Sequence, residues 1–231
     1  MTLPQSETPT VLITRPAAAA ERFRAALEKS AGPFRSLILP AFEIVSFGVS
    51  IPDFDMAIFT SRAGVAFAPK GRDRVAFCVG DATSEAAMRS GYRAHSAQGS
   101  ASDLCQVILA QAPLGKLLHI RGEVSLGDVM ATLSAGGLHC SEVVAYRKDP
   151  ARPDREILNT IAEVKNLIIP LFSAETVSII GSWDIDFGSA MTVSISSAVG
   201  HAAVVLNPAE IVVADAPNLP SMVASTARLI A

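Results

Sequence analysis

Short apolar segments alternate with segments of helical periodicity along most of the chain. Phe23 and Leu27 recur four residues apart among Ala, Glu and Arg, and Gly32 follows at the kind of position where helices end. Strands that alternate with helices in this way are typical of βαβ units and of parallel sheets. The β-branched, apolar segments predict strands at Val11–Arg15, Leu37–Leu39, Met56–Phe59, Val75–Val79, Leu117–Ile120, Leu167–Leu171, Thr192–Ser196 and Ile211–Val213.

The chain also repeats itself weakly. Three pairs of segments are similar and occur in the same order, which suggests two α/β lobes of one architecture. Lobes of this kind generally bind a ligand in the crevice between the carboxyl ends of their strands. The pairs are VLITRP at 11–16 with LLHIRG at 117–122, IFTSRAGV at 58–65 with PLFSAETV at 170–177, and FCVGDATSEAA at 77–87 with SISSAVGHAAV at 194–204.

Composition supports an α/β protein and excludes several partners. With 231 residues, 50% hydrophobic and 18% charged, the chain is long enough for one large domain or two small ones. Aromatic residues make up only 6%, and abundant Ala, Val, Leu and Ile are typical of parallel sheets covered on both faces. A net charge of −3 without a run of Lys or Arg argues against a nucleic-acid partner.

Targeting and redox signals are weak. The polar start MTLPQSETPT and the lack of an 18-residue apolar stretch predict a cytoplasmic protein without membrane contact, which we expect to be a monomer. Cys78, Cys105 and Cys140 are odd in number and outside any CxxC pattern. We therefore expect buried, reduced thiols rather than disulfides or a zinc site.

No standard cofactor motif is present. The chain contains no GxGxxG, GxxxxGK[ST], HExxH or GxSxG, which argues against nucleotide, zinc and serine-hydrolase chemistry. His95, His119, His139 and His201 lack the spacing of metal ligands. We expect no cofactor and no metal, and we interpret His119, inside a predicted strand, as a packed core residue.

A small hydroxyl or a glycine recurs where a predicted strand meets a helix. Each of these residues alone is best interpreted as a helix cap. Taken together, helix N-termini with free N–H groups around one crevice form a site for carboxylates or phosphates that needs few basic side chains. The residues are Thr14, Thr60, Ser61, Gly80, Thr83, Ser173, Ser196 and Ser197.

Two further kinds of side chain are candidates for the same crevice. Arg15, Arg62 and Arg121 occupy the same junctions, where each is either a solvated surface residue or a group that grips a carboxylate. Tyr146 follows the apolar segment Val143–Ala145. It is either an ordinary strand aromatic or a phenol that projects from a linker into the crevice.

Seven motifs, in order and with their spacing, resemble the uroporphyrinogen-III synthase family from about Val11 to the end of the chain. They are VLITRP, LILPAFEI, IFTSRAGV, VGDAT, IRGEVSLGDVMATLSAGG, VVAYRKDP and LFSAETV. One departure is that Ile195–Val199 replaces the family's Gly-x-Thr-Ala-like turn in the second lobe, although Ser196 and Ser197 keep a hydroxyl there.

The resemblance implies a discontinuous fold of two Rossmann- or flavodoxin-like lobes. Residues 1–40 and 149–231 would form one lobe and residues 41–148 the other, with a cleft between them. Two antiparallel linkers would pass near Pro40–Val45 and Val143–Pro150. The family cyclises hydroxymethylbilane, a linear tetrapyrrole with acetate and propionate on every ring, with inversion of the last ring and loss of water. It uses no cofactor.

The resemblance also implies roles for individual residues. Tyr146 is similar in position to the family's tyrosine that is proposed as the proton donor. Closure of the lobes would confine the flexible substrate. The expected substrate-binding residues are Thr14, Arg15, Ser61, Arg62, Gly80, Thr83, Arg121, Gly122, Ser173 and Ser197.

Two other classes of function remain open from the residues alone. A non-catalytic, hinged binding module for a small polycarboxylate would share the lobes and the junction amides but would need no proton donor. A glycosyltransferase with two Rossmann-like lobes is disfavoured, because the phosphate and ribose motifs are missing and such enzymes usually exceed 231 residues.

Overall fold

The chain folds into two compact α/β units. The computed structural model describes residues 8–124 and 127–230. The first unit combines the chain up to Glu43 with the chain from Asp149 onward, and the second unit is Ile44–Lys148. Ser125 and Leu126 of the motif IRGEVSLGDVM lie outside the described residues, as do residues 1–7 at the polar start.

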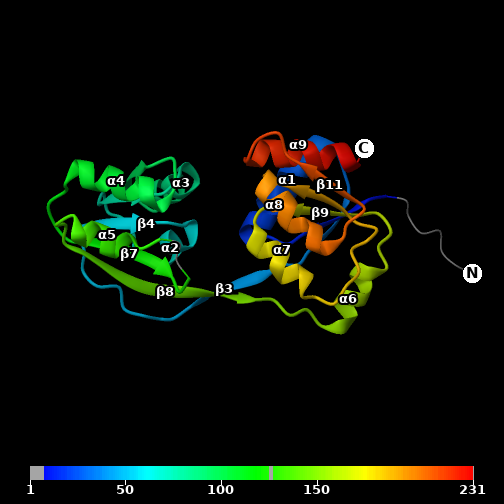
Figure 1. The fold of residues 1–231 in the computed structure, drawn as a ribbon, viewed down its shortest axis with the longest axis horizontal. Coiled ribbons are helices and arrows are strands. Elements are labelled where there is room, and N and C mark those ends of the chain that lie inside the picture. Colours follow the sequence, from blue (N-terminus) through cyan, green and yellow to red (C-terminus); the bar gives the residue numbers. More distant parts are fainter. Residues whose placement is uncertain (1–7, 125–126, 231) are drawn as a thin grey trace, which may run out of the picture. The chain divides into compact units, whose positions relative to one another are not determined.

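The first unit is built on a five-stranded sheet with the order β11-β10-β9-β1-β2 (Figure 1). All of its strand pairs are parallel. Taken in chain order within the unit, this is the flavodoxin-like order 2-1-3-4-5, in which the connections reverse direction between β1 and β9. Its elements are β1 (Thr10–Ile13), α1 (Ala17–Ala31), β2 (Arg35–Ile38), α6 (Arg155–Ala162), β9 (Leu167–Leu171), α7 (Ala174–Gly181), β10 (Met191–Ser194), α8 (Ser197–Ala203), the 3₁₀ turn η1 (Val204–Leu206), β11 (Glu210–Val213) and α9 (Leu219–Ile230).

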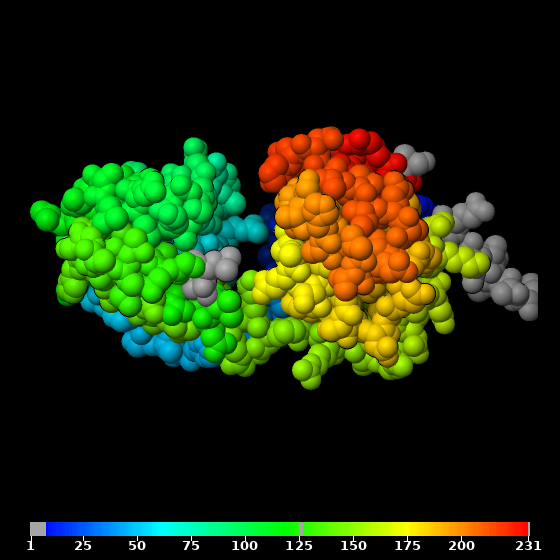
Figure 2. Space-filling model, viewed as in Figure 1, coloured from blue at the N-terminus to red at the C-terminus, as the bar shows by residue number. Residues whose placement is uncertain are grey.

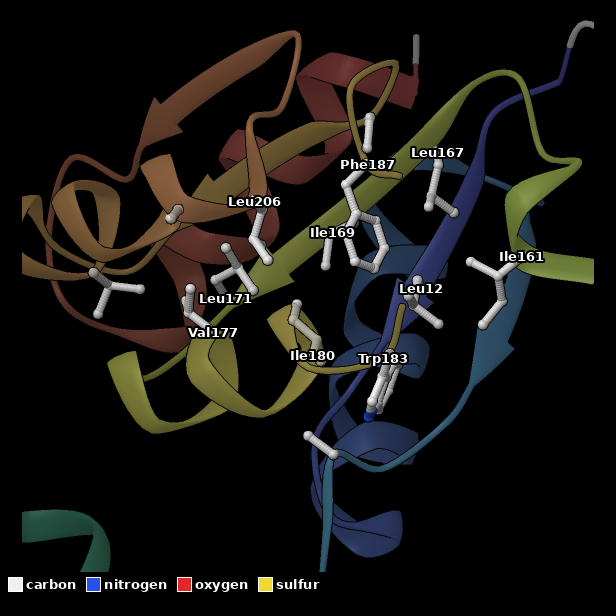
Figure 3. Close-up of a cluster of buried hydrophobic side chains, with 14 of the residues drawn as sticks. Leu12, Ile161, Leu167, Ile169, Leu171, Val177, Ile180, Trp183, Phe187 and Leu206 are labelled. Carbon is white, nitrogen blue, oxygen red and sulfur yellow. The ribbon is translucent and has the colours of Figure 1, made fainter. Parts of the chain in front are cut away.

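Alternation along the buried strands divides the core of this unit into two layers. Val11 and Ile13 pack with Phe23 of α1 on one face of the sheet. Leu12 belongs to the cluster on the other face, where Trp183 lies (Figure 3). Burying one such aliphatic side chain contributes about 1.5–3 kcal/mol, so the two layers hold helices against both faces. The yellow, orange and red side chains of α7, α8 and α9 accordingly form much of the surface of this unit in Figure 2.

The second unit contains a six-stranded sheet with the order β3-β8-β7-β4-β5-β6. The pairs from β8 to β6 are parallel. From β4 onward the chain order is 3-2-1-4-5, a doubly wound arrangement that reverses between β4 and β7. The elements are β3 (Phe42–Ser46), β4 (Met56–Phe59), α2 (Arg62–Phe67), β5 (Val75–Cys78), α3 (Asp81–Arg89), β6 (Arg93–Ser96), α4 (Ala101–Gln111), β7 (Leu117–Gly122), α5 (Val129–Ala135) and β8 (Cys140–Pro150).

The chain crosses between the units twice, within β3 and within β8. The two strands are neighbours (Figure 1). Phe47 N–H donates to the carbonyl of Ala145 at 3.0 Å, and Ala151 N–H donates to the carbonyl of Ala41 at 2.8 Å. Residue numbers therefore rise along one strand as they fall along the other, so β3 and β8 are antiparallel.

The two-unit α/β fold predicted from the sequence is confirmed, and each predicted strand lies within one or two residues of a strand in the structure. The edge strand β6 was missed because its sequence RAHS is polar. The expected cleft between the lobes stays a prediction.

The sheet topology agrees with the interpretation of the repeated segments, which pairs β1 with β7, β4 with β9 and β5 with β10. The order β2-β1-β9-β10-β11 in one sheet corresponds strand by strand to β8-β7-β4-β5-β6 in the other, and the direction reverses between β1 and β9 in the first and between β7 and β4 in the second. The equivalent strands occur in a different order along the chain in the two units, because the first unit begins with β1 and β2 whereas β7 and β8 come last in the second.

Two further expectations concern the burial of the thiols and the presence of membrane-spanning helices. Cys78, Cys105 and Cys140 are free; the first two are buried, but Cys140 is only partly buried, contrary to expectation. No helix among the described residues is both long and apolar enough to cross a membrane.

Candidate active site

A partly buried pair of hydroxyl groups lies at the carboxyl edge of the second unit's sheet. Ser61 lies two residues after the end of β4, and its Oγ lies 2.7 Å from the phenol oxygen of Tyr146 on β8. Ser61 also caps α2, because its Oγ accepts a hydrogen bond from Gly64 N–H at 3.2 Å. The cap fixes the position of Ser61, so the phenol of Tyr146 meets a hydroxyl held by a helix N-terminus.

Aromatic and glycine neighbours hold the ring of Tyr146 in place. Its side chain is 5% exposed and stacks on Phe67 of α2 with the ring centroids 5.2 Å apart. On β7 the ring lies against Gly122, where a Cβ would come within 2.7 Å of the Tyr146 ring. Any residue but glycine at position 122 would therefore displace the phenol.

A β-bulge turns Tyr146 toward α2. The register pairs Arg121 with Val144 and then Gly122 with Tyr146, so β8 contains one extra residue, Ala145. Side chains normally alternate between the two faces of a strand, yet Ala145 and Tyr146 belong to the same core cluster. The bulge breaks the alternation and places the phenol on the face where Ser61 lies.

Arg121 spans this bulge. Its Nε and Nη2 bind the two carboxylate oxygens of Glu142 at 2.9 and 2.6 Å. Its Nη1 donates to the carbonyls of Gly122 and Glu123 at 2.9 and 3.1 Å. The hydrogen bond from the Arg121 guanidinium lowers the pKa of the Glu142 carboxyl group, which favours the ionised carboxylate. The fork expected to grip a substrate carboxylate is thus already occupied by one from β8.

His119 lies on the face of β7 opposite to the one that Tyr146 contacts. It is packed in the core, as expected. It is 1% exposed, and Nε2 lies 3.2 Å from Thr60 Oγ1. Nδ1 has no hydrogen-bond partner among the described residues. Loss of hydration lowers the pKa of His119 to about 4, because burial disfavours the charged imidazolium. The imidazole is therefore neutral at pH 7.

Helix N-termini follow the carboxyl ends of strands in both units, but the predicted caps are only partly correct. Ser61, Ser173 and Ser196 each accept a bond from a backbone N–H in the first turn of their helix. Ser197 is the exposed first residue of α8, next to the cap. Gly80 precedes α3 without a side-chain cap, and Thr83 is buried within the first turn of that helix.

The capping interpretation is wrong for Thr14, because Pro16 precedes α1 and no side chain caps that helix. Thr14 is 1% exposed, and its Oγ1 has no partner in the described part of the chain. Its neighbour Arg15 places its guanidinium carbon 3.8 Å from the centroid of the Phe172 ring. Arg15 thus lies at the reversal point between β1 and β9, and Ser173 follows Phe172 directly.

The structure brings the predicted site residues together in two sets, one within each unit. Ser61 and Gly122 each contact Tyr146, with Arg121 beside them, whereas Arg15, Phe172 and Ser173 gather at the reversal point of the first unit. Arg62 is exposed on α2. Sequence reasoning missed Glu142 and Phe67, since no local pattern shows which residues flank a tyrosine. Among the described residues no group of three His, Cys, Asp or Glu side chains could hold a metal ion.

Two doubly wound α/β units, one of which holds a partly buried phenol–hydroxyl pair at the carboxyl edge of its sheet, define a two-unit α/β protein of the doubly wound class. The chain belongs to the uroporphyrinogen-III synthase HemD family, whose model matches residues 21–224. Members of this family are cyclising lyases of tetrapyrrole biosynthesis and act on hydroxymethylbilane.

Solved structures agree with this fold. Uroporphyrinogen-III synthetase from Helicobacter pylori is 12% identical, with a TM-score of 0.67 over 96% of this chain and 99% of that one. A mutant uroporphyrinogen III synthase from Thermus thermophilus is 17% identical, with a TM-score of 0.50 over 96% and 98% of the two chains. No curated protein sequence matches the chain significantly.

Proposed function

We propose that this protein converts hydroxymethylbilane to uroporphyrinogen III and that Tyr146 is the acid that releases the substrate's hydroxyl group. The observation that carries the proposal is the 2.7 Å contact between the Tyr146 phenol and Ser61 Oγ at the carboxyl edge of a doubly wound sheet. Ligands of such sheets bind at this edge, next to the point where the strand order reverses.

The reaction needs a proton where the C–O bond of the hydroxymethyl group breaks. The phenol of Tyr146 gives its proton to that oxygen, which leaves as water while the pyrrole ring supplies the electron pair and becomes a cationic azafulvene. The azafulvene carbon bonds to the substituted α-carbon of the last ring, and the bond from that carbon to its original bridging carbon then breaks and forms again at the unsubstituted α-carbon, which inverts the ring. The unsubstituted α-carbon loses its proton in this last step, which restores the phenol. One water molecule is then the only by-product, and no cofactor takes part.

Ser61 makes this transfer easier. When Tyr146 loses its proton, the phenolate needs a donor, and the hydroxyl of Ser61 lies within hydrogen-bond distance. The N-terminus of α2 adds a favourable partial positive charge near the same atoms. A hydrogen bond to a charged group contributes about 1.5–3 kcal/mol, so Ser61 stabilises the form of the phenol that appears during the reaction.

The carboxylates of the substrate need partners that do not depend on a basic surface. Free N–H groups at the N-termini of α2, α3, α7 and α8 supply such partners, near Gly80, Ser173 and Ser197. Arg15 and Arg62 add cationic groups beside them. The side chains of Thr14 and Thr83 are buried, so these two residues would support the backbone of the junctions. Many weak contacts would share the binding, so the loss of any one should weaken it only in part.

The proposal is tested by turnover of freshly prepared hydroxymethylbilane. The purified protein should form the type III isomer without added metal or nucleotide, and a chelator should leave the rate unchanged. Chromatography of the oxidised products separates the isomers. If only the type I isomer appears, as in the spontaneous reaction, the proposal is wrong; substrate binding without turnover would instead favour the binding-module alternative.

Tyr146→Phe tests the assignment of the acid. The substitution removes one oxygen and keeps the ring that stacks on Phe67, so stability should change little. The turnover number should fall by about 10²–10⁴, the effect of losing a general acid, with KM nearly unchanged. A folded Tyr146→Phe protein with normal turnover would remove Tyr146 from the mechanism. Tyr92→Phe, the same change at the chain's other tyrosine, is the matched control.

A further inference from the structure

We infer that Arg121 and Glu142 act as a positioning pair that holds Tyr146 in its reactive orientation by locking the bulge between β7 and β8. The inference rests on the proposed function of Tyr146. It assigns Arg121 a role other than gripping substrate, and it assigns Glu142 a role that the sequence did not suggest.

The first argument is the place of the pair in the sheet. In a regular register without the bulge, Gly122 would pair with Ala145, and strand alternation would turn Tyr146 to the opposite face of the sheet, away from Ser61. The orientation of the phenol therefore depends on the bulge. A bulge forfeits regular ladder hydrogen bonds locally, so it needs other contacts to hold its geometry.

Arg121 supplies those contacts from both strands. Its four hydrogen bonds join the carboxylate of Glu142 on β8 to the carbonyls of Gly122 and Glu123 at the end of β7. Glu123 N–H in turn donates to the carbonyl of Tyr146 at 2.8 Å. The guanidinium thus connects Glu142, which precedes the bulge on β8, with Gly122 and Glu123 on the other strand. Through Glu123 it is also linked to the backbone of Tyr146.

The second argument is the chemistry of the pair. A bidentate Arg–carboxylate contact is stronger and more directional than a single ion pair. The two side chains are only 18% and 30% exposed, so water screens them less than a fully exposed pair. A substrate carboxylate would have to displace Glu142 to form the same fork. The hydrogen bonds of the Arg121 guanidinium go to Glu142 and to two backbone carbonyls, as a structural role requires.

The test compares Arg121→Ala, Glu142→Gln and the double variant in the turnover assay. A misplacement of about 1 Å can cost about 10²-fold in rate, so each single variant should lose about 10- to 100-fold in kcat with little change in KM. The double variant should be no slower than the slower single variant, because both changes unlock the same bulge. In the Tyr146→Phe background neither change should reduce kcat further.

The opposite pattern overturns the inference. If Arg121 binds substrate directly, Arg121→Ala should raise KM, whereas Glu142→Gln should free the guanidinium and leave KM unchanged or lower it. The matched control is the exposed pair Arg155–Asp184 in the first unit, with an N···O distance of 2.7 Å. Arg155→Ala and Asp184→Asn should leave kcat and KM as in the parent protein.

A spectroscopic measurement separates this inference from the proposed function. Tyr146 and Tyr92 are the only tyrosines, so ring-labelled tyrosine gives two sets of NMR signals that Tyr92→Phe assigns. In Glu142→Gln the Tyr146 signals should shift and those of Tyr92 should not. An unmoved Tyr146 signal overturns the inference even if the enzyme makes the type III isomer. A moved signal supports positioning even if Tyr146→Phe proves active and the acid is another group.

Discussion

Substitution of Gly122 tests the geometry of the site without touching any polar group. In Gly122→Ala the added Cβ would lie 2.7 Å from Cε2, 2.9 Å from Cζ and 3.2 Å from the phenol oxygen of Tyr146. Carbon atoms in van der Waals contact are about 3.5–4.0 Å apart. The ring must therefore move by roughly 0.7 Å or more, and its stack on Phe67 limits the directions open to it.

The expected consequences follow from this displacement. A shift approaching 1 Å at a catalytic group can lower the rate by about 10²-fold, so kcat should fall by about 10- to 100-fold in the hydroxymethylbilane assay. Overpacking of this kind costs about 1–3 kcal/mol of stability, which denaturant unfolding would measure. The fraction of type I isomer should rise as enzyme is diluted, because the spontaneous reaction then competes.

A matched control is available in the first unit. In Gly181→Ala the added carbon would meet only Leu206 Cδ2, at 3.4 Å, which is ordinary contact. This variant should keep full activity and lose no stability, since alanine is the better helix former at the end of α7. A Gly122→Ala protein with the kcat of Gly181→Ala would refute the assignment of a precisely held phenol.

Three further outcomes are expected. Ser61→Gly should cost only a few tenths of a kcal/mol of stability, since glycine is a tolerable N-cap, yet it should lower kcat by about 10- to 100-fold because the phenolate loses its donor. Ser61→Thr keeps a hydroxyl and should have most of the parent rate. Equal kcat in the parent protein and both variants would contradict the role of the hydroxyl. His119 has a pKa of about 4 in the folded protein against 6.5 for the free group, so the unfolded chain binds the extra proton between these values. Stability should therefore be unaffected by this residue above pH 6.5 and fall as the pH drops toward 4, by about 3 kcal/mol in all; His119→Leu should lack this part of the pH dependence in denaturant titrations, and an unchanged slope would show that other groups cause it. Burial raises the pKa of Cys78 to about 12 and that of Cys140 to about 11, so a thiol reagent at pH 8 should label the native protein far more slowly than the urea-unfolded chain, and equally fast labelling would disprove protection by the fold.

The sequence by itself determined the fold class, most of the strands and the family. Buried parallel strands are apolar throughout, so segments such as Leu167–Leu171 are visible as continuous hydrophobic stretches. The N-caps Ser61 and Ser173 were also predictable, because a helix end needs a local acceptor and the cap adjoins its helix in sequence. Tyr146 was a candidate from the residues alone, but its role as proton donor was predicted only through the family resemblance.

Only the tertiary structure decided how the site is built. Whether Tyr146 faces Ser61 depends on one extra residue in β8, and alternation along VVAY cannot show a bulge whose other half lies on β7. The same holds for Arg121, whose partner Glu142 is 21 residues away. Thr14 looked like a cap but is buried and does not cap α1, since Pro16 is the residue that precedes that helix. Local hydrogen bonds and periodicity depend on residues that are neighbours in the sequence, whereas register and the pairing of distant side chains arise only when strands assemble.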